Sequence, residues 1–148
     1  MGKIRITKLF HFEMAHALNG HDGLCANIHG HSYKLQVTIV GVPVDNCKSP
    51  KNGMLIDFSD LKRIVKESVI DRYDHALVLN NTTDNTILSV LQKHYNKIIM
   101  VDYQPTTEQM LIDFAKMLQK SFPPEISLYS LRLSETETSY AEWFVEDE

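Results

Sequence analysis

The residues best suited to chemistry lie within one short stretch near the N-terminus: His16, Cys25 and the tripeptide His29-Gly30-His31. Histidine is the commonest metal ligand in proteins, and a neutral imidazole suits zinc. Three histidines are a typical protein contribution to a catalytic zinc site, where a fourth position stays open for water or substrate. Cys25 allows two interpretations. It is either a fourth ligand that closes the site or a free thiolate that acts as a base near the metal.

The spacing of these histidines fits a β-hairpin. His29 and His31 are two residues apart, so on a strand both imidazoles lie on the same face. His16 ends the preceding predicted strand and can reach the same ion if the two strands pair. The alternative is three unrelated surface histidines, because the chain has seven. His11, His21 and His94 lack this geometry, and we do not expect them to be ligands.

Three further positions carry candidate acid–base or recognition groups. In Asp74-His75 a carboxylate can orient an imidazole, although an ordinary polar helix C-terminus also explains this pair. Glu108 falls in the first turn of a predicted helix, where it can simply complement the helix dipole. Glu135 ends a predicted strand, where its carboxylate could accept two hydrogen bonds from the N–H and NH₂ edge of a guanine-like ring. A plain surface glutamate is the alternative.

The bulk composition predicts a single domain spanning residues 1–148. Apolar residues make up 43% of the 148 residues, which favours a folded core over disorder. The net charge of −4 comes without a long basic run, so no nucleic acid or membrane partner is expected. No secretory leader or transmembrane run is recognisable, and we expect a cytoplasmic protein with Cys25 and Cys47 as thiols.

Hydrophobic periodicity predicts an α+β fold. Alternation predicts strands over 4–15, 31–40, 127–134 and 139–145, with shorter strands over 54–58 and 98–101. A helix is expected from Ser59, another over 85–95, and a third after Pro105 with Thr106 and Gln109 as a capping box. Since hairpins dominate, we expect an antiparallel sheet with helices on one face. The other face would need cover, and a second subunit is the natural candidate.

Taken together, six motifs in order resemble the 6-pyruvoyl-tetrahydropterin synthase and 6-carboxytetrahydropterin synthase family. The resemblance spans nearly the whole chain. Any one motif is weak evidence, but the ordered set is highly specific. The motifs are Phe12-Glu13-Met14-Ala15-His16, Cys25-x₃-His29-Gly30-His31, the segment 54–62, Asp74-His75, Pro105-Thr106-Thr107-Glu108 and Glu135-Thr136.

This resemblance implies a particular architecture. It implies the tunnelling fold, in which two helices pack on a four-stranded antiparallel sheet. Three subunits would close a twelve-stranded barrel, and two such trimers would stack into a homohexamer with active sites between subunits.

The resemblance also implies roles for individual residues. His16, His29 and His31 match zinc ligands, and Cys25 matches a catalytic thiol. Asp74 with His75 matches a proton-relay pair. The positions that match pterin-anchoring residues are Thr107, Glu108 and Glu135.

The substrate implied by the family is 7,8-dihydroneopterin triphosphate. Carboxy-type members, in the queuosine pathway, release acetaldehyde and triphosphate, whereas pyruvoyl-type members keep the three-carbon side chain. The short Cys25-x₃-His29 gap and the chain length resemble the carboxy-type, which we therefore expect. Two features depart from the family pattern: Gln109 replaces an asparagine, and the segment 81–103 is longer than usual. A non-enzymatic alternative is a zinc-stapled binding module with Cys25 as fourth ligand.

Overall fold

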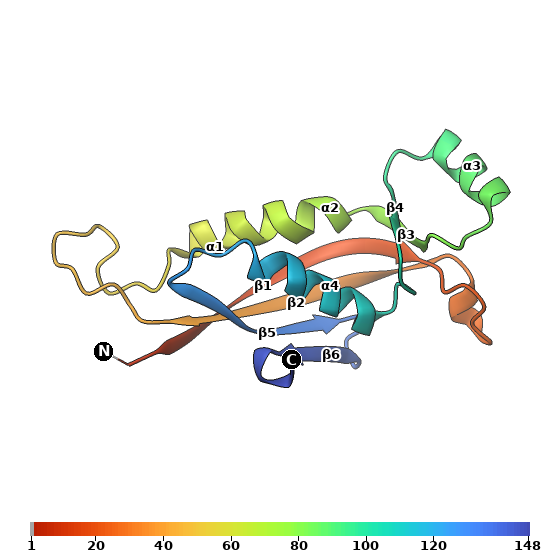
Figure 1. Cartoon of the computed structure of the whole chain (residues 1–148). Helices are drawn as coiled ribbons and strands as arrows, with labels where there is room; N and C mark the ends of the chain where they lie inside the picture. The colour runs from red at the N-terminus through yellow and green to blue at the C-terminus, as the bar shows by residue number, and fades with distance from the viewer. Residues whose placement is uncertain (1) are drawn as a thin grey trace.

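The fold is a curved sheet covered by helices, seen in a computed structural model that describes residues 2–148 (Figure 1). The strands are β1 (Ile4–His16), β2 (His29–Gly41), β3 (Ala76–Asn80), β4 (Ile98–Val101), β5 (Ile126–Ser134) and β6 (Tyr140–Phe144). The helices are α1 (Phe58–Val65), α2 (Asp71–Tyr73), α3 (Asn85–His94) and α4 (Thr107–Gln119). A π-helical turn, η2 (Lys66–Ile70), joins α1 to α2, and short 3₁₀ turns form η1 (Leu24–Ala26) and η3 (Val145–Asp147). The α+β class expected from the sequence is confirmed.

The sheet is larger than the family resemblance implies. Its six strands run in the order β4-β3-β1-β2-β5-β6. The expected four-stranded antiparallel sheet is present as β1, β2, β5 and β6. However, β3 pairs in parallel with β1, and β4 pairs in parallel with β3, so the whole sheet is mixed. The connection from β3 through α3 to β4 is a βαβ unit, the kind of crossover that parallel pairing requires.

Two strand predictions fail for identifiable reasons. The sequence analysis missed β3, because its continuous apolar run directly follows the polar Asp74-His75 turn. The predicted strand over 54–58 is wrong. Leu55 there is buried in the core, but the segment folds back on the preceding loop through hydrogen bonds between Val44 and both Gly53 and Met54.

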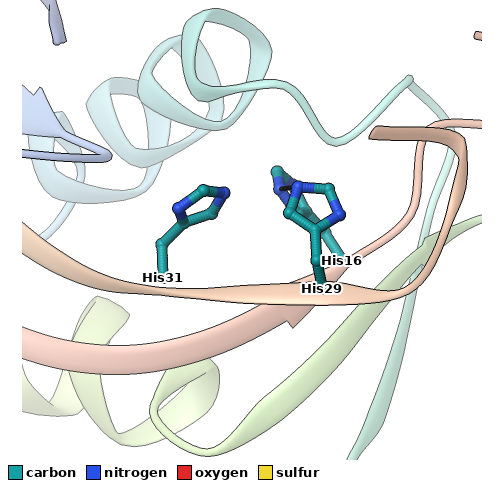
Figure 2. Close-up of side chains that lie close together, drawn as sticks. All are labelled: His16, His29 and His31. Atoms are coloured by element: carbon teal, nitrogen blue, oxygen red, sulfur yellow. Dashed lines mark hydrogen bonds between the residues drawn. The ribbon is translucent and has the colours of Figure 1, made fainter. Parts of the chain in front are cut away.

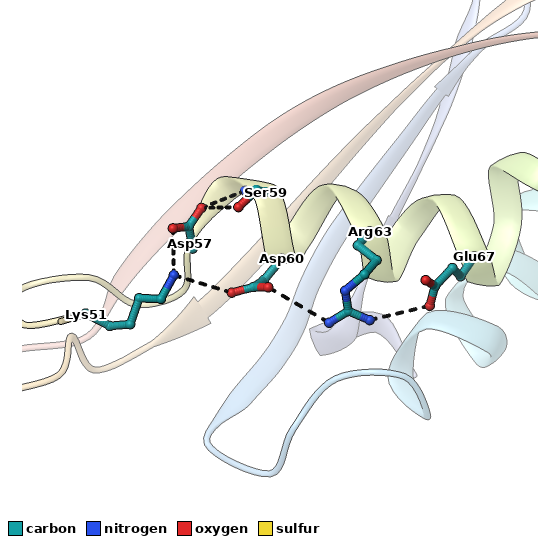
Figure 3. Close-up of polar contacts among 6 residues, drawn as sticks. All are labelled: Lys51, Asp57, Ser59, Asp60, Arg63 and Glu67. Atoms are coloured by element: carbon teal, nitrogen blue, oxygen red, sulfur yellow. Dashed lines mark hydrogen bonds and ion pairs between the residues drawn. The ribbon is translucent and has the colours of Figure 1, made fainter. Parts of the chain in front are cut away.

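The end of that segment instead starts a helix (Figure 3). The carboxylate of Asp57 caps α1 by accepting hydrogen bonds from the backbone N–H and the hydroxyl of Ser59. Lys51 Nζ lies 2.7 Å from the same carboxylate, and ion pairs continue along the helix through Asp60 and Arg63. Hydrogen bonds from Lys51 and Ser59 hold the pKa of Asp57 well below its usual value.

The core lies between one face of the sheet and the helices. Along β1 the side chains alternate, so Phe10, Phe12 and Met14 are buried while His11 and Glu13 are exposed. The helices α1, η2 and α4 bury their apolar stripes against this face, with Leu61, Val65, Val69, Met110, Phe114 and Leu118 in one core cluster. The other face carries polar pairs such as Thr7 with Thr38 and Arg132 with Glu142. Helices on one face are thus confirmed.

The helix α3 stands apart from this core at one end of the molecule (Figure 1). Asp84 caps it by accepting hydrogen bonds from the backbone N–H groups of Thr86 and Ile87. None of its residues is buried, and Ile87 and Val90 are more than half exposed. Across residues 2–148, no helix has the length and apolar character to cross a bilayer.

Phe114 is the best single test of this packing. Its ring lies between Phe12 and Tyr73, at centroid distances of 6.2 and 4.8 Å, and it is 0% exposed. We predict that Phe114→Ala lowers the free energy of unfolding by about 3–5 kcal/mol, measured by urea denaturation. Ile112→Ala, on the exposed side of α4, is the matched control and should cost under ~1 kcal/mol. Equal losses for the two variants would contradict the assigned helix face.

Candidate active site and metal centre

Three imidazoles meet at the end of the β1–β2 pair (Figure 2). His16 is the last residue of β1 and lies directly opposite His29, the first residue of β2. His31 follows two residues later on the same strand face. One ring nitrogen from each histidine lies within 4.8 Å of the other two. The structure therefore brings together the three residues predicted as ligands, from the two paired strands that the spacing indicated.

Hydrogen bonds to backbone carbonyls fix the tautomers of two of the three histidines in the form that can bind a metal ion. His16 Nδ1 donates to the carbonyl of Pro105 and His29 Nδ1 donates to the carbonyl of Asn27, each at 2.7 Å. Because a carbonyl can only accept, these bonds leave Nε2 with a free lone pair in each neutral ring. Burial lowers the pKa of His16, and the neighbouring His29 lowers it further. The hydrogen bond to Pro105 raises the pKa but does not cancel this effect. The lowered pKa favours the neutral imidazole, which is the form that binds metals.

The positions of the Nε2 atoms show whether the three histidines could hold a metal ion. The Nε2 atoms of His16 and His29 are 3.1 Å apart, so two acceptors face each other. His31 Nε2 is buried and, within residues 2–148, makes no hydrogen bond. A cation shared by the three nitrogens would satisfy all of them. The donor set, three neutral imidazoles, suits a divalent metal such as zinc.

A cavity of about 310 Å³ opens beside these rings. His16, Cys25, Thr107, Glu108 and Glu135 all line it, so most of the predicted site residues do come together. Cys25 lies half-buried in the turn η1. Among the described residues, the cluster that can share an ion contains the three histidines and no cysteine. This geometry favours the free-thiol interpretation of Cys25 over a closed Cys-His₃ site.

Glu135 and Thr107 form one wall of the cavity. Glu135 directly follows β5, and its Oε1 lies 3.4 Å from His31 Nε2 and 3.7 Å from His16 Nε2. Thr107 is the first residue of α4 and is only 8% exposed, yet its hydroxyl makes no hydrogen bond to any described residue. Thr106 caps the helix by accepting from the backbone N–H of Gln109, which is one half of the predicted capping box. The other half is not formed, because the backbone N–H of Thr106 donates to the carbonyl of Gln104. Glu108 follows in the first turn and is exposed.

Asp74 and His75 form a pair, although adjacent residues on a regular strand point to opposite faces. His75 adopts a left-handed backbone conformation with φ of +60°, which turns its ring back so that Nδ1 lies 3.0 Å from Asp74 Oδ2. Two backbone contacts hold this strained turn: Glu13 N–H donates to the Asp74 carboxylate, and His75 N–H donates to the Glu13 carbonyl. Burial alone would raise the pKa of Asp74, but the Glu13 and His75 bonds outweigh it and lower the pKa. The residue stays ionised and can orient the imidazole.

The structure does not bring His75 to Cys25. His75 lines a different cavity of about 730 Å³, together with Ile28, Leu91 and Tyr95. Cys25 lines only the smaller cavity among the described ones. Within one chain, the predicted proton-relay residue His75 and the predicted thiol therefore line different cavities.

Sequence reasoning missed the residues that support the ligands. The two carbonyls that fix the histidine tautomers belong to Asn27 and Pro105, and a backbone group carries no side-chain signal. Tyr33, whose ring contacts His16 and His31, was also missed. Its spacing from His31 could have revealed it, because residues two apart share a strand face.

Comparison with known proteins agrees with this geometry. Residues 5–146 match the protein family described as 6-pyruvoyl tetrahydropterin synthase. A 6-carboxy-5,6,7,8-tetrahydropterin synthase from Haemophilus influenzae is 44% identical, covering 94% of this chain and 97% of that protein. The protein of the same name from Synechocystis is 31% identical, with 94% and 92% covered.

Solved structures show the same fold at lower identity. Caenorhabditis elegans 6-pyruvoyl tetrahydropterin synthase superposes with a TM-score of 0.69 at 23% identity, covering 97% of this chain and 96% of the other. An uncharacterised protein from Wolinella succinogenes gives a TM-score of 0.73 at 17% identity, covering 98% and 99%.

Loss of one histidine should abolish the metal centre. We predict that the protein binds one Zn²⁺ per chain and that His29→Ala weakens the affinity more than about a hundredfold, since three ligands become two. A titration against a competing chelator measures this affinity. His94→Ala, at the exposed end of α3, is the control and should bind as the unmodified chain does. Equal zinc affinity in the two variants would contradict the assigned ligands.

Proposed function

Since the chain belongs to the 6-pyruvoyl tetrahydropterin synthase family, we propose that it is a zinc-dependent enzyme making 6-carboxy-5,6,7,8-tetrahydropterin. Its substrates would be 7,8-dihydroneopterin triphosphate and one water molecule, with acetaldehyde and triphosphate released in a cytoplasmic step of queuosine biosynthesis. The observation that carries this proposal is the three-histidine cluster opening on a cavity that also holds Cys25 and Glu135. The name of the Haemophilus influenzae relative supports the carboxy-type product.

The chain supplies the groups that this reaction needs. Bound to His16, His29 and His31, zinc would supply Lewis-acid polarisation of the side-chain hydroxyls, which acidifies the neighbouring C–H groups. Cys25 lines the same cavity, and we assign it the removal of a proton from the substrate side chain.

Recognition of the pterin ring falls to the opposite wall. The Glu135 carboxylate can accept from the ring's amide N–H and its amino group, a two-bond pairing that fixes orientation. Thr107 contributes a buried hydroxyl with a free hydrogen-bonding capacity, and we assign Glu108 to the same ring-binding group. A second proton transfer is assigned to His75, which Asp74 orients.

A pyruvoyl-type reaction is the second candidate. The family itself takes its description from 6-pyruvoyl tetrahydropterin synthase. The two reactions differ in whether the three-carbon side chain is cleaved. A zinc-stapled binding module fits less well, because Cys25 lies outside the ligand cluster.

Product analysis tests the proposed function directly. We predict that the zinc-loaded protein converts 7,8-dihydroneopterin triphosphate into 6-carboxytetrahydropterin and acetaldehyde, both identified by mass. Formation of 6-pyruvoyltetrahydropterin would instead establish the second candidate. If no pterin product forms, the enzyme proposal itself fails.

We also propose that the active site is completed by a second copy of the chain. Cys25 and His75 line separate cavities in one chain, so a copy must bring its His75 to the Cys25 cavity for both to act on one substrate. The edges of the four-stranded antiparallel part are β6 and the first part of β1, residues 4–12, because β3 pairs only with Met14, Ala15 and His16 at the end of β1. Their outer backbone groups are available for strand addition. A homohexamer built as a dimer of trimers, as the family resemblance implies, would use these edges and cover the polar sheet face.

A mixing experiment tests the shared site. Cys25→Ala and His75→Ala should each be folded and loaded with zinc but inactive. When the two variants are unfolded, mixed in equal amounts and refolded together, we predict recovery of about one quarter of the normal activity, because random assembly restores that share of two-chain sites. Each variant refolded alone is the control. No recovery from the mixture, despite normal assembly, would contradict a site shared between chains.

A further inference from the structure

A buried tyrosine beside the metal centre lacks a hydrogen-bond partner. Tyr33 lies on β2, two residues after His31, and therefore points to the same face of the sheet as the predicted ligands. It is 0% exposed, and its hydroxyl makes no hydrogen bond within residues 2–148. Leaving a buried hydroxyl unpaired is unfavourable, so native structures seldom keep one without a reason.

The unpaired hydroxyl faces residues of the candidate active site. Its ring packs against His16 and His31, whose Nε2 atoms lie 3.7 and 3.4 Å from the Glu135 carboxylate. Burial and the Glu135 carboxylate raise the pKa of the hydroxyl, while Thr107 lowers it, and both of these residues line the cavity of about 310 Å³. The side-chain atoms that are buried and unpaired in the described residues are this hydroxyl, Thr107 Oγ1 and His31 Nε2. Their gathering at one place indicates that this region completes its hydrogen bonds only when the site is loaded.

The ring of Tyr33 is held rigidly, so its hydroxyl has a fixed direction. Phe12 stacks on it at 5.2 Å with an interplanar angle of 10°. His31 packs edge-on at 5.6 Å. A donor fixed in this way loses little entropy when it forms a hydrogen bond.

Glu135 is the charged acceptor among these neighbours. Its carboxylate lies next to the Nε2 atoms of His16 and His31, at 3.7 and 3.4 Å. An imidazole nitrogen that binds a metal carries no hydrogen to donate. His16 Nε2 already lacks a hydrogen because of the bond to Pro105, and His31 Nε2 makes no hydrogen bond to a described residue. A donor that fixes the carboxylate must therefore come from another residue.

We propose that Tyr33 is a positioning residue: its hydroxyl donates to the Glu135 carboxylate and orients it toward a ligand with adjacent N–H and NH₂ groups. The identity of that ligand as a pterin rests on the proposed function. Tyr33 touches no reacting atom in this scheme and acts through Glu135.

The test compares two isosteric tyrosine variants in the zinc-loaded protein. Tyr33→Phe should raise KM for dihydroneopterin triphosphate at least about tenfold, the value of a hydrogen bond to a charged group, while kcat changes less. Affinity for 7,8-dihydroneopterin, which lacks the phosphates, should fall by the same factor in a fluorescence titration. Zinc content should stay unchanged.

Tyr73→Phe is the matched control. Tyr73 is also 0% exposed, but its hydroxyl already donates to Asp113 at 3.2 Å, in the core beneath α4. This variant should lower the melting temperature and leave KM unchanged. A purely structural role for Tyr33 would give the same pattern as Tyr73.

A double-mutant cycle shows whether Tyr33 acts through Glu135. Glu135→Gln alone should weaken dihydroneopterin binding, and adding Tyr33→Phe should have little further effect. Full additivity, or an unchanged affinity in Tyr33→Phe, would overturn the inference.

Failure of the inference and failure of the proposed function give different results. If the unmodified protein turns over the triphosphate and Tyr33→Phe has the same KM, the function stands and the inference falls. If the unmodified protein binds dihydroneopterin through Tyr33 but forms no product, the inference stands and the proposed reaction falls. If it does neither, both fall.

Discussion

The antiparallel register of β1 and β2 is the constraint on which the rest of the site depends. In this register His16 lies opposite His29, and His31 lies opposite Met14. A shift of β2 by one residue would move His29 and His31 to the polar face of the sheet, together with the core residues Tyr33 and Leu35. The same pairing that buries the core therefore also assembles the cluster of three histidines that could hold a metal ion. Folding and site formation are one event, because both use the same face of the same two strands.

The candidate site contains side chains held firmly by hydrogen bonds and, beside them, hydroxyl groups that lack a hydrogen-bond partner. Backbone carbonyls of Asn27 and Pro105 fix the tautomers of two histidines, and burial keeps His16 neutral. Near them, the hydroxyls of Tyr33 and Thr107 have no partner among the described residues. This combination is typical of a preorganised site, in which hydrogen bonds within the protein fix the side chains while the groups that recognise the ligand remain unpaired until it binds. The strained backbone of His75 is a second sign of function, since backbone contacts to Glu13 hold it in place.

Much of this could be predicted from the sequence, because strand alternation and metal-ligand spacing are local patterns. The ligand histidines, the capped helix α4 and the antiparallel strands follow from such patterns. The parallel strand β3 was missed, because its partner β1 lies more than sixty residues earlier in the chain and no turn connects the two. The Asp74–His75 pairing was underestimated, because it depends on a left-handed residue that no local rule assigns to histidine. Cys25 and His75 line different cavities, and this could not be predicted from the sequence because no local pattern shows which cavity a residue faces.

The central claim is a metal held by three imidazoles, with Cys25 left free for chemistry. X-ray absorption at the zinc edge of the loaded protein tests this claim most directly, because it counts the atoms that bind the metal. We expect three nitrogen ligands at about 2.0 Å, a remaining oxygen ligand and no sulfur. A sulfur ligand at about 2.3 Å, lost in Cys25→Ala, would contradict it and identify a closed structural site instead.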